Sequence, residues 1–496
     1  MLTLIQNTLA KDSSAIHLPK YNPTELTAGI AHIGVGNFHR AHQAYYTNNY
    51  LNLTKQTNWG IRGIGITASG KSMATKFANQ DSLYTLTEYL PNGSSNVSVV
   101  GAIMDYVAAS DDSEKAIEYL ANPAIKIVSL TITEGGYNMD ENGNFRLDTP
   151  AICHDLANPG KPETAFGYVT EALARRRERG SGPFTVLSCD NLQHNGHVAK
   201  KAFLSFAYAR DPELANWIAD QVTFPNSMVD RITPTVDDLD RLRLNAESGI
   251  NDAMPVYCED FTEWVIEDNF CAGRPDWELA GVTFVDDVAP YEALKLRFLN
   301  ASHSMLAYPA FLAGYRTVHE AMNDSVFSNY ISVFINHIVT PLVTPPDPVD
   351  LTDYKNKLVS RLSNAAVSDQ LARLCFDGAS KLPTFLLPTL KDLAAQNKPT
   401  YCIAFLIAAY GHYLRAKADD KGTSYTVDEP FLSEVDWLKI RDTDELAFLD
   451  TSPLASAGLR TIPHFAAAYK LYRKQIAIYG VAFSLRQAMC TFWETI

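Results

Sequence analysis

The sequence of 496 residues lacks the features that mark secreted, metal-binding and membrane-spanning proteins. Its cysteines form no C-x-x-C pair and do not cluster with histidines, so we expect no zinc site, and scattered thiols of this kind are typical of a reducing cytosol. No apolar run is long enough to cross a bilayer, and the first residues lack the basic and apolar segments of a signal peptide. We therefore expect a cytoplasmic protein with no metal and no membrane partner.

Positive charge is also scarce. The chain has 42 Lys and Arg against 56 Asp and Glu, a net charge of −14, which argues against nucleic acid as a general partner. A small anionic ligand in a local basic pocket remains compatible with this balance. Apolar residues make up 46% and charged residues 20%, as in globular proteins, and the length exceeds one ordinary core.

The pattern of apolar residues changes near residue 285. Before it, short apolar runs alternate with helical patterns, which predicts an α/β domain with a mainly parallel sheet. The expected strands are 28–33, 59–66, 97–103, 125–132 and 184–188, and the expected helices are 40–53, 69–79, 112–121, 162–178 and 194–210. After it, only helical patterns follow, at 290–311, 315–340, 351–362, 364–375, 386–396, 399–417 and 462–490. We predict a dinucleotide-binding domain over 1–287 and a mainly helical substrate domain over 288–496.

A glycine turn follows the first predicted strand and precedes a helix. Gly34 and Gly36 fit the first two positions of G-x-G-x-x-G, and His39 occupies the third. Glycines at these positions let the backbone approach a pyrophosphate. The alternative is a tight turn with no ligand, in which Arg40 pairs with a surface carboxylate and His39 is structural. The predicted cofactor contacts in this turn are Ile33, Gly34, Val35, Gly36, Asn37, Phe38, His39 and Arg40.

The choice between NAD and NADP is open in the sequence. The end of the second strand of a dinucleotide fold normally carries an acid that binds the ribose hydroxyls, but residues 66–71 contain none. Ser69 and Lys71 could hydrogen-bond a 2′-phosphate, or they could face water while other contacts hold NAD. Glu134 lies in a glycine-containing segment after another buried strand and is a further predicted cofactor contact.

Lys295, Asn300 and His303 form K-x4-N-x2-H in a segment whose composition predicts a helix over 292–311. In an α-helix, Asn300 would lie about 140° and His303 about 80° around the axis from Lys295, so the three groups would share a broad face. An amine, an amide and an imidazole can move a proton and stabilise an alkoxide. Burial is expected to lower the pKa of Lys295 toward neutrality, as a base requires.

Other polar residues lie in less distinctive surroundings. Asn191 follows the strand 184–188 and would reach a ligand there or cap the next helix. Asp230 would bind a substrate hydroxyl or pair with Arg231. Arg373 and Lys381 flank a glycine-containing turn and would hold substrate oxygens or remain solvated.

With these motifs the chain resembles the mannitol dehydrogenase family, the polyol-specific long-chain dehydrogenases. The runs Gly34–Gln43, Thr133–Tyr137, Asp190–Asn191 and Lys295–His303 carry the resemblance. It implies a Rossmann-type N-terminal domain, a helical C-terminal domain, a monomer, and metal-independent hydride transfer with NAD between D-mannitol and D-fructose. The absence of an acid near Ser69 leaves NADP open.

The resemblance also implies a role for each matching residue. Lys295 would be the general base, Asn191 and Asn300 would bind the reacting oxygen, His303 would orient the substrate, Glu292 would help the proton leave, and Asp230, Arg373 and Lys381 would line the polyol pocket. Three alternatives stay open: a sugar-acid reductase of the fructuronate or mannonate type, an arabinitol or sorbitol dehydrogenase, and a dinucleotide sensor without turnover.

Overall fold

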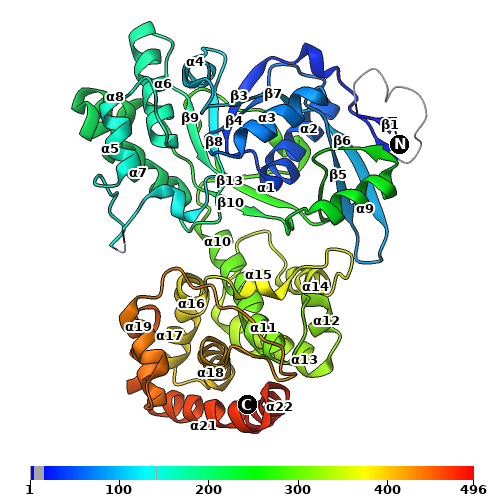
Figure 1. Ribbon diagram of the computed structural model, residues 1–496, viewed down its shortest axis with the longest axis vertical. Coiled ribbons are helices and arrows are strands. Elements are labelled where there is room, and N and C mark those ends of the chain that lie inside the picture. Colours follow the sequence, from blue (N-terminus) through cyan, green and yellow to red (C-terminus); the bar gives the residue numbers. More distant parts are fainter. Residues whose placement is uncertain (1, 5–15, 141, 496) are drawn as a thin grey trace. The chain divides into compact units, whose positions relative to one another are not determined.

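The structure is a computed structural model that describes residues 2–4, 16–140 and 142–495 (Figure 1). It contains two compact units, Met1–Leu90 with Ser94–Ala289, and Pro91–Gly93 with Pro290–Ile496. Within the described residues, no helix has the length and apolar character needed to cross a membrane.

The first unit is built on a five-stranded sheet in the order β7-β4-β3-β8-β9. Its strands are β3 (Ala28–Ile33), β4 (Gly60–Gly65), β7 (Ile103–Ala108), β8 (Ile127–Leu130) and β9 (Thr185–Ser188). Every neighbouring pair is parallel, so the predicted α/β architecture with a mainly parallel sheet is confirmed.

Both faces of this sheet are covered, which explains why its strands are continuous apolar runs. Along β3, Ile30 packs into one core cluster, whereas Ala31 and Ile33 pack into the other. Helices α4 (Ser113–Ala121), α6 (Ala165–Arg179) and α7 (Asn195–Arg210) contribute to the second cluster, and α2 (Gln43–Thr54) contributes to the first (Figure 1).

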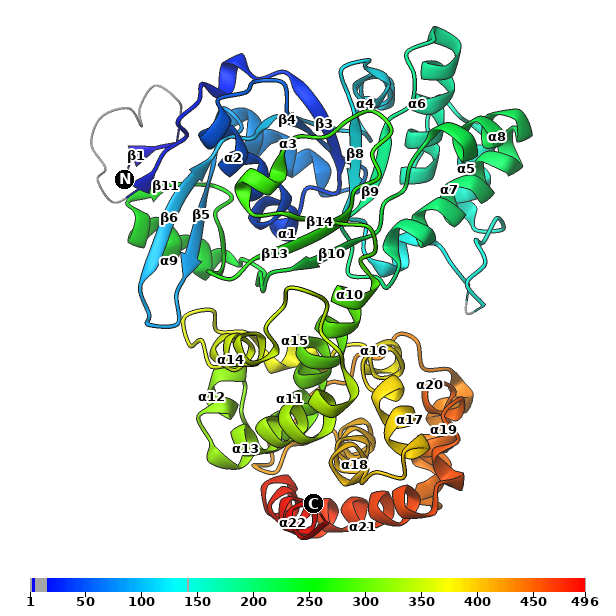
Figure 2. The same cartoon turned by 180° about the vertical axis from the view of Figure 1, so that it is seen from behind.

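Two smaller sheets extend this unit (Figure 2). One has the order β12-β5-β6-β2 and the other β10-β13-β14, with β2 (Ile16–His17), β5 (Tyr84–Tyr89), β6 (Ser95–Val100), β10 (Ser227–Asp230), β12 (Val256–Glu259), β13 (Glu263–Glu267) and β14 (Thr283–Val285). The single strand expected over 97–103 was wrong: β6 ends at Val100 and β7 begins at Ile103 in a different sheet. The apolar run is continuous across Gly101, so hydropathy gives no sign of the change.

This unit also contains the two-stranded pair β1 (Leu2–Thr3) and β11 (Ile250–Asn251), and helices α1 (Asn37–Ala41), α3 (Gly70–Asn79), α5 (Pro150–Ala157), α8 (Pro212–Gln221) and α9 (Asp238–Ser248).

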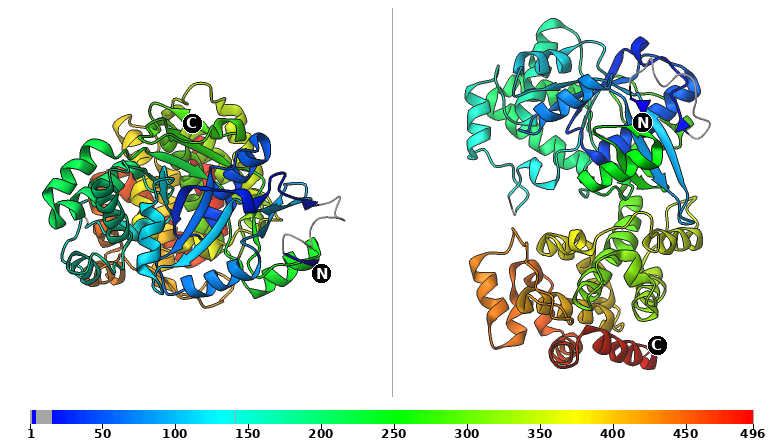
Figure 3. Two further views of the ribbon diagram at one scale, coloured as in Figure 1. Left: turned by 90° about the horizontal axis from the view of Figure 1, so that it is seen from above. Right: turned by 45° about the vertical axis from the view of Figure 1, so that its right-hand side comes forward.

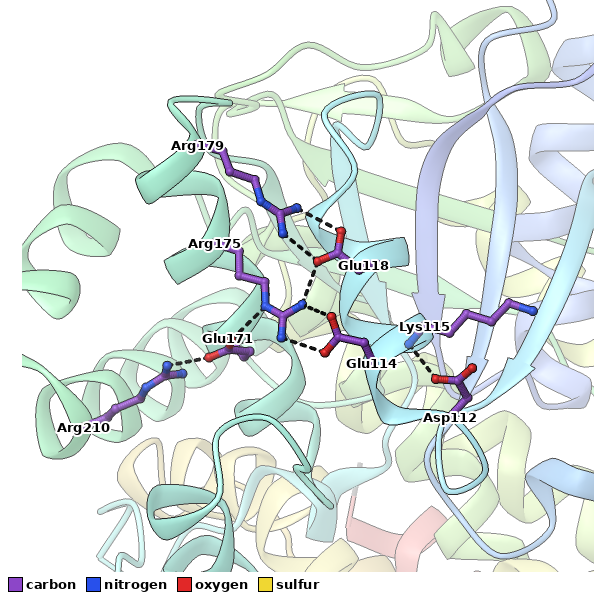
Figure 4. A network of polar contacts seen from close by, with 8 residues as sticks. All are labelled: Asp112, Glu114, Lys115, Glu118, Glu171, Arg175, Arg179 and Arg210. Carbon is purple, nitrogen blue, oxygen red and sulfur yellow. Dashed lines mark hydrogen bonds and ion pairs between the residues drawn. The ribbon is translucent and has the colours of Figure 1, made fainter.

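An ion-pair network joins the helices on the α6 face (Figure 4). Arg175 of α6 pairs with Glu114 at 2.6 Å and with Glu118 at 2.6 Å, both on α4, and with Glu171 one turn earlier on its own helix at 2.9 Å. Glu171 also accepts from Arg210 of α7 at 2.5 Å. The network therefore ties α4 and α7 to the α6 helix between them.

The second unit is built from helices and the loops that join them (Figure 3). Its helices are α10 (Ala289–Lys295), α11 (Ala301–Leu312), α12 (Val318–Met322), α13 (Ser325–Val333), α14 (Leu351–Leu362), α15 (Leu371–Cys375), α16 (Gly378–Phe385), α17 (Leu387–Ala395), α18 (Tyr401–Ala416), α19 (Glu434–Arg441), α20 (Ser452–Ala455), α21 (Pro463–Tyr479) and α22 (Val481–Thr495). Helices α11 and α18 are buried on nearly every side, as helices apolar all round should be. The predicted mostly helical C-terminal region is confirmed.

Three predicted helix boundaries in this unit were wrong. The helix expected over 315–340 is α12, α13 and a π-helical segment Phe334–Val339. The helix expected over 364–375 begins only at Leu371. The helix expected over 462–490 is interrupted at Gly480, where φ is +78°. The sequence patterns extended across these breaks because the apolar periodicity continues on both sides of each.

Candidate active site

The glycine turn lies at the point where the order of the central sheet reverses. The chain leaves β3, adds β4 and then β7 on one side, and returns to place β8 and β9 on the other. In open α/β sheets a ligand binds at the carboxyl ends of the strands at such a switch point. The segments after β3, β8 and β9 carry Gly34, Glu134 and Asn191, so the structure brings these predicted contacts to one edge of the sheet.

Only glycine fits at Gly34. Its φ is +98°, and an added Cβ would lie 2.0 Å from the carbonyl oxygen of Thr131. Gly36 differs, because it is exposed and an added Cβ would meet only the Gly34 oxygen, at 3.9 Å. This open flank leaves room for a phosphate group against the backbone, so the turn fits a dinucleotide.

His39, at the third position of the glycine pattern, packs helix α1 against strand β3. Its ring stacks on His32, with 3.5 Å between the ring centroids and 13° between the planes. His32 in turn interacts with the hydroxyls of Ser129 at 2.8 Å and Thr131 at 2.9 Å. Burial lowers the pKa of His32 to about 3 and lowers that of His39 well below its usual range. Both rings are therefore neutral near pH 7.

Arg40 lies inside the protein, with 2% of its surface exposed. Its guanidinium donates to the carbonyl oxygen of Met254, to that of Gly36 at 3.4 Å and to Asn37 Oδ1 at 2.7 Å. The alternative of a surface carboxylate partner was wrong. Arg40 holds the glycine turn in shape, and a direct contact with a cofactor stays a prediction.

The other predicted residues of the turn differ in exposure. Ile33 and Val35 are buried in the core clusters, whereas Asn37 and Phe38 are half-buried. The Asn37 amide donates to the Pro234 carbonyl at 3.3 Å. The Val35 and Ile33 side chains therefore position the backbone, which is the part of the turn that a dinucleotide would meet.

Asp190 lies in one of the runs that carry the family resemblance, but no role was predicted for it. Its carboxylate accepts from the backbone N–H of Ile132 at 3.1 Å and Thr133 at 2.8 Å, and from the Tyr137 hydroxyl at 2.8 Å. It thereby joins the segment after β9, which carries Asn191, to the segment after β8. Burial raises the pKa of Asp190 to about 6. An acid directly after a buried strand was the available signal.

Two alternatives for neighbouring residues were wrong. Helix α7 begins at Asn195 with His194 as its N-cap, so Asn191 does not cap it. Arg231 does not pair with Asp230, because its guanidinium pairs with Glu88 and stacks over the Tyr45 ring. Asp230 lies in β10 with 3% of its surface exposed.

The segment that carries Lys295, Asn300 and His303 is helical throughout, but it is not one α-helix. Lys295 ends α10, Leu296–Asn300 form a π-helical segment, and His303 lies in the first turn of α11. The expected α-helical separation of Lys295 and Asn300 was therefore wrong. An i→i+5 hydrogen-bond pattern widens each turn, so residues five apart lie closer to one face than in an α-helix, and such segments are frequent at functional sites.

This segment is largely enclosed. Lys295 is 7% exposed and Glu292, one turn earlier, is 4% exposed, whereas Asn300 and His303 are half-buried. Among the described residues, Asn300 Oδ1 is buried and accepts no hydrogen bond. A buried amide oxygen of this kind is suited to a ligand hydroxyl.

Arg373 and Lys381 both have protein partners. Arg373 forms two bonds to Asp369, at 2.8 and 2.9 Å, and is half-exposed. The Lys381 ammonium donates to the carbonyl of Phe376 at 2.6 Å, at the C-terminus of α15. Burial lowers the pKa of Lys381, and Arg373 acts in the same direction. A role in substrate binding stays a prediction for both residues.

Glu429 organises the helix that carries Lys381, and no sequence motif marks it. Its carboxylate accepts from the N–H groups of Gly378 at 2.9 Å and Ala379 at 3.0 Å, and from the Tyr410 hydroxyl at 3.0 Å. Burial raises its pKa to about 7. The N-terminus of α16 is thus fixed by a titratable group.

No group of three or more His, Cys, Asp or Glu among the described residues could hold a metal ion. The polar groups described above are amines, amides, imidazoles, guanidinium groups, hydroxyls and carboxylates.

Family models match nearly the whole chain. The mannitol dehydrogenase Rossmann domain matches residues 28–279, and the mannitol dehydrogenase C-terminal domain matches residues 287–473. The chain belongs to the mannitol dehydrogenase family. The resemblance inferred from its motifs and the predicted Rossmann-type fold are confirmed.

Similar proteins with assigned names agree with this family. A polyol:NADP oxidoreductase of Gluconobacter oxydans is 46% identical over 87% of this chain and 89% of its own length. A mannitol 2-dehydrogenase of Phaeosphaeria nodorum is 39% identical over 92% of this chain and 80% of its own. Both relatives are named for redox chemistry on polyols.

Two solved structures are similar over almost the entire chain. The Pseudomonas fluorescens mannitol 2-dehydrogenase, in a ternary complex with NAD and D-mannitol, has a TM-score of 0.89 and 43% identity, covering 98% of this chain and 99% of that protein. A substrate-free D-sorbitol dehydrogenase has a TM-score of 0.90 and 43% identity, covering 98% of this chain and 100% of that protein.

Proposed function

We propose that this protein is a nicotinamide-dependent polyol dehydrogenase that interconverts D-mannitol and D-fructose. The observation that carries the proposal is the similarity, over 98% of the chain, to a mannitol 2-dehydrogenase solved with NAD and D-mannitol. The glycine turn and the K-x4-N-x2-H segment add the chemical parts that such a reaction needs.

The coenzyme supplies hydride transfer when it is bound. The turn at Gly34 and Gly36 would hold its pyrophosphate, because the close approach of Thr131 fixes the backbone on one flank while the other flank is open. Glu134 and Ser69 are exposed at the ends of β8 and β4 and would contact other parts of it.

Lys295 would accept the proton of the reacting hydroxyl. It is 7% exposed, so its amine lies largely out of bulk water, and burial disfavours the charged form of an amine. Glu292, on the preceding turn of α10, would pass the proton onward.

Asn191 and Asn300 would donate their amides to the alkoxide that forms when the proton leaves, and His303 would orient the same oxygen. Loss of one such donor lowers the rate by about 10²–10³. Asp230, Arg373 and Lys381 would bind the remaining hydroxyls of the polyol.

The test is a substrate panel followed by one variant. Purified protein is assayed with D-mannitol, D-sorbitol, D-arabinitol and D-mannonate, each with NAD and with NADP. Oxidation of D-mannitol with the highest kcat/KM supports the proposal. Preference for D-mannonate would instead establish the sugar-acid alternative, and coenzyme binding without turnover of any substrate would establish the sensor.

Lys295→Ala then tests the base. We expect kcat for mannitol oxidation to fall by several orders of magnitude while NADH still binds, and Lys391→Ala, at an exposed lysine of α17, serves as the control. Near-normal turnover of Lys295→Ala would remove Lys295 from this role.

D-Sorbitol oxidation is the second candidate activity. The similarity to a D-sorbitol dehydrogenase over 98% of the chain favours it. The same panel ranks the two polyols directly.

We also propose that the protein is a monomer and that it is cytoplasmic, as expected from the sequence. Sedimentation of the purified protein tests the monomeric state, and cell fractionation tests the location.

A further inference from the structure

The end of β4 in this chain differs from the usual end of the second strand in a dinucleotide fold. An acid at that position accepts hydrogen bonds from the ribose hydroxyls of NAD and would repel the 2′-phosphate of NADP. Here the strand ends at Gly65 and the chain continues through Ile66, Thr67, Ala68 and Ser69 into α3, with no acid. The repulsive group is therefore missing from this segment.

The structure places other polar groups there. The hydroxyls of Thr67 and Ser69 are 2.9 Å apart and both residues are exposed. Lys71, in the first turn of α3, pairs with Asp111, and their side chains are 64% and 47% exposed. One cation and two hydroxyl groups thus lie within five residues of each other, on the solvent side of the strand end.

Asp111 follows the neighbouring strand β7 in the chain. It lies in the turn after β7, and β7 pairs with β4 in parallel, so both strands end at the same edge of the sheet. The acid that is missing from the β4 end is thus supplied by the next strand, where it is held by Lys71. An exposed pair of this kind exchanges readily with another partner.

A phosphate ester would compete for Lys71. It carries close to two negative charges near pH 7 and several strong acceptor oxygens, whereas Asp111 carries one charge. Thr67 and Ser69 can each donate a hydroxyl to phosphate oxygens. Asp111 opposes the phosphate in two ways, by occupying the Lys71 ammonium and by repelling the anion.

We propose that the Thr67–Lys71 segment accepts the 2′-phosphate of NADP(H), with Lys71 as its cation and Asp111 as the group that limits the preference for it. This inference rests on the coenzyme binding in the proposed function, but it does not depend on which polyol reacts. It assigns dual use of NAD and NADP to this chain.

Dissociation constants test the inference without turnover. NADH and NADPH are titrated by their fluorescence, and AMP and adenosine 2′,5′-bisphosphate are compared as competitors of NADH. The proteins are wild type, Lys71→Gln, Asp111→Asn and Ser69→Asp, with Lys76→Gln on the same helix as the control. We expect wild type to bind both coenzymes with constants within about tenfold of each other, since the exposed pair resists the phosphate only weakly.

The variants should separate the two coenzymes. Lys71→Gln should weaken the binding of NADPH by about tenfold and change the binding of NADH by no more than about twofold. The variant loses a charge-assisted contact to the 2′-phosphate, which only NADPH carries. Asp111→Asn should strengthen the binding of NADPH severalfold. Ser69→Asp should weaken the binding of NADPH by about a hundredfold, because the new carboxylate repels the 2′-phosphate directly. The Lys71 effect should shrink as salt is added.

Each outcome decides between the proposals. An unchanged dissociation constant for NADPH in Lys71→Gln overturns the inference. So does a wild-type protein that binds NADPH several hundredfold more weakly than NADH. Wild type that binds neither coenzyme overturns both this inference and the proposed function. Binding of both coenzymes with no turnover of any polyol overturns the proposed function alone.

Discussion

The imidazole rings of His32 and His39 lie face to face, with their centroids 3.5 Å apart. His39 occupies the position where the dinucleotide fingerprint has its third glycine, whose usual role is to let a helix approach a strand closely. In this chain a stacked pair of neutral rings forms the contact between helix α1, which carries His39, and strand β3, which carries His32. His39 is 1% exposed, so burial holds its ring together with the stack on His32.

This pair should make the protein sensitive to acid. Burial lowers the pKa of His32 to about 3 and that of His39 well below its usual 6.5, so between about pH 6 and these lowered pKa values both rings gain protons on unfolding. The stability that they contribute is present above the usual pKa of histidine and is lost as pH falls. His39→Phe keeps a ring but cannot titrate.

We therefore expect the free energy of unfolding of His39→Phe to vary less with pH than that of wild type between about pH 4 and pH 6. The difference between the two slopes should correspond to about one proton taken up on unfolding. Urea unfolding at several pH values measures the slope, and His17→Phe, at an exposed histidine, is the control. Equal slopes in His39→Phe and wild type would show that His39 is protonated in the folded protein.

The glycine turn could be predicted from the sequence, and the histidine stack could not. Gly34 and Gly36 stand between an apolar run and a helical pattern, which are local signals. His32 lies within the strand itself, and its contact with His39 depends on how α1 packs back on β3. Local patterns carry no information about that packing.

The reacting segment shows a different limit. Its composition predicts a helix, and Lys295, Asn300 and His303 do lie in continuous helical turns. The π-helical segment between Lys295 and Asn300 was not predicted, because helix propensities do not distinguish i→i+5 from i→i+4 hydrogen bonds. The roles of Asp190 and Glu429 were not predicted for a related reason: each accepts from backbone N–H groups and from a tyrosine hydroxyl far away in the chain, and a local sequence pattern does not specify such partners.

Replacement of Asp190 should loosen two predicted ligand segments together. Asp190→Asn removes the charge that accepts from Ile132 and Thr133, and the Asn amide would turn an N–H toward one of these donors. We expect amide exchange at Ile132 and Thr133 to quicken by at least about tenfold and NADH binding to weaken. Hydrogen exchange with mass spectrometry measures the first and fluorescence titration the second.

Asp148→Asn, at an exposed acid of the same unit, should change neither quantity. Unaltered exchange in Asp190→Asn would mean that the segment after β8 is held by other contacts.

The ion-pair network around Arg175 should contribute a salt-sensitive part of the stability. Arg175→Gln leaves Glu114, Glu118 and Glu171 without their shared cation. We expect a loss of about 1–2 kcal/mol at low salt, since several partly exposed pairs are lost at once. At about 1 M salt the difference from wild type should shrink, because the Debye length falls to about 3 Å. Thermal unfolding at both salt concentrations measures it.

Arg177→Gln, on the same helix, is the matched control, because its contact with Glu213 is longer, at 3.6 Å. A loss that is equal at low and high salt would attribute the Arg175 effect to packing of its aliphatic stem.

The same network also depends on pH. The hydrogen bond from Arg179 lowers the pKa of Glu118 to about 2 from its usual value of 4.5. The stability that the Glu118 carboxylate contributes is therefore present above pH 4.5 and is lost as pH falls through 2.

Glu429 should impose the opposite dependence on pH. Burial raises its pKa from the usual 4.5 to about 7, against the lowering effect of the Ala379 and Gly378 N–H groups and the Tyr410 hydroxyl, with Asp377 adding to the rise. The folded protein therefore holds a proton that the unfolded chain has already lost. The stability contribution is complete below about pH 4.5 and is lost as pH rises through 7, by up to about 3 kcal/mol.

Glu429→Gln cannot ionise, so its free energy of unfolding should fall less than that of wild type between about pH 5 and pH 8. Urea unfolding measures the slope, which is independent of any constant loss from altered hydrogen bonds. Parallel slopes in the two proteins would mean that Glu429 remains ionised inside the fold, balanced by the donors that surround it.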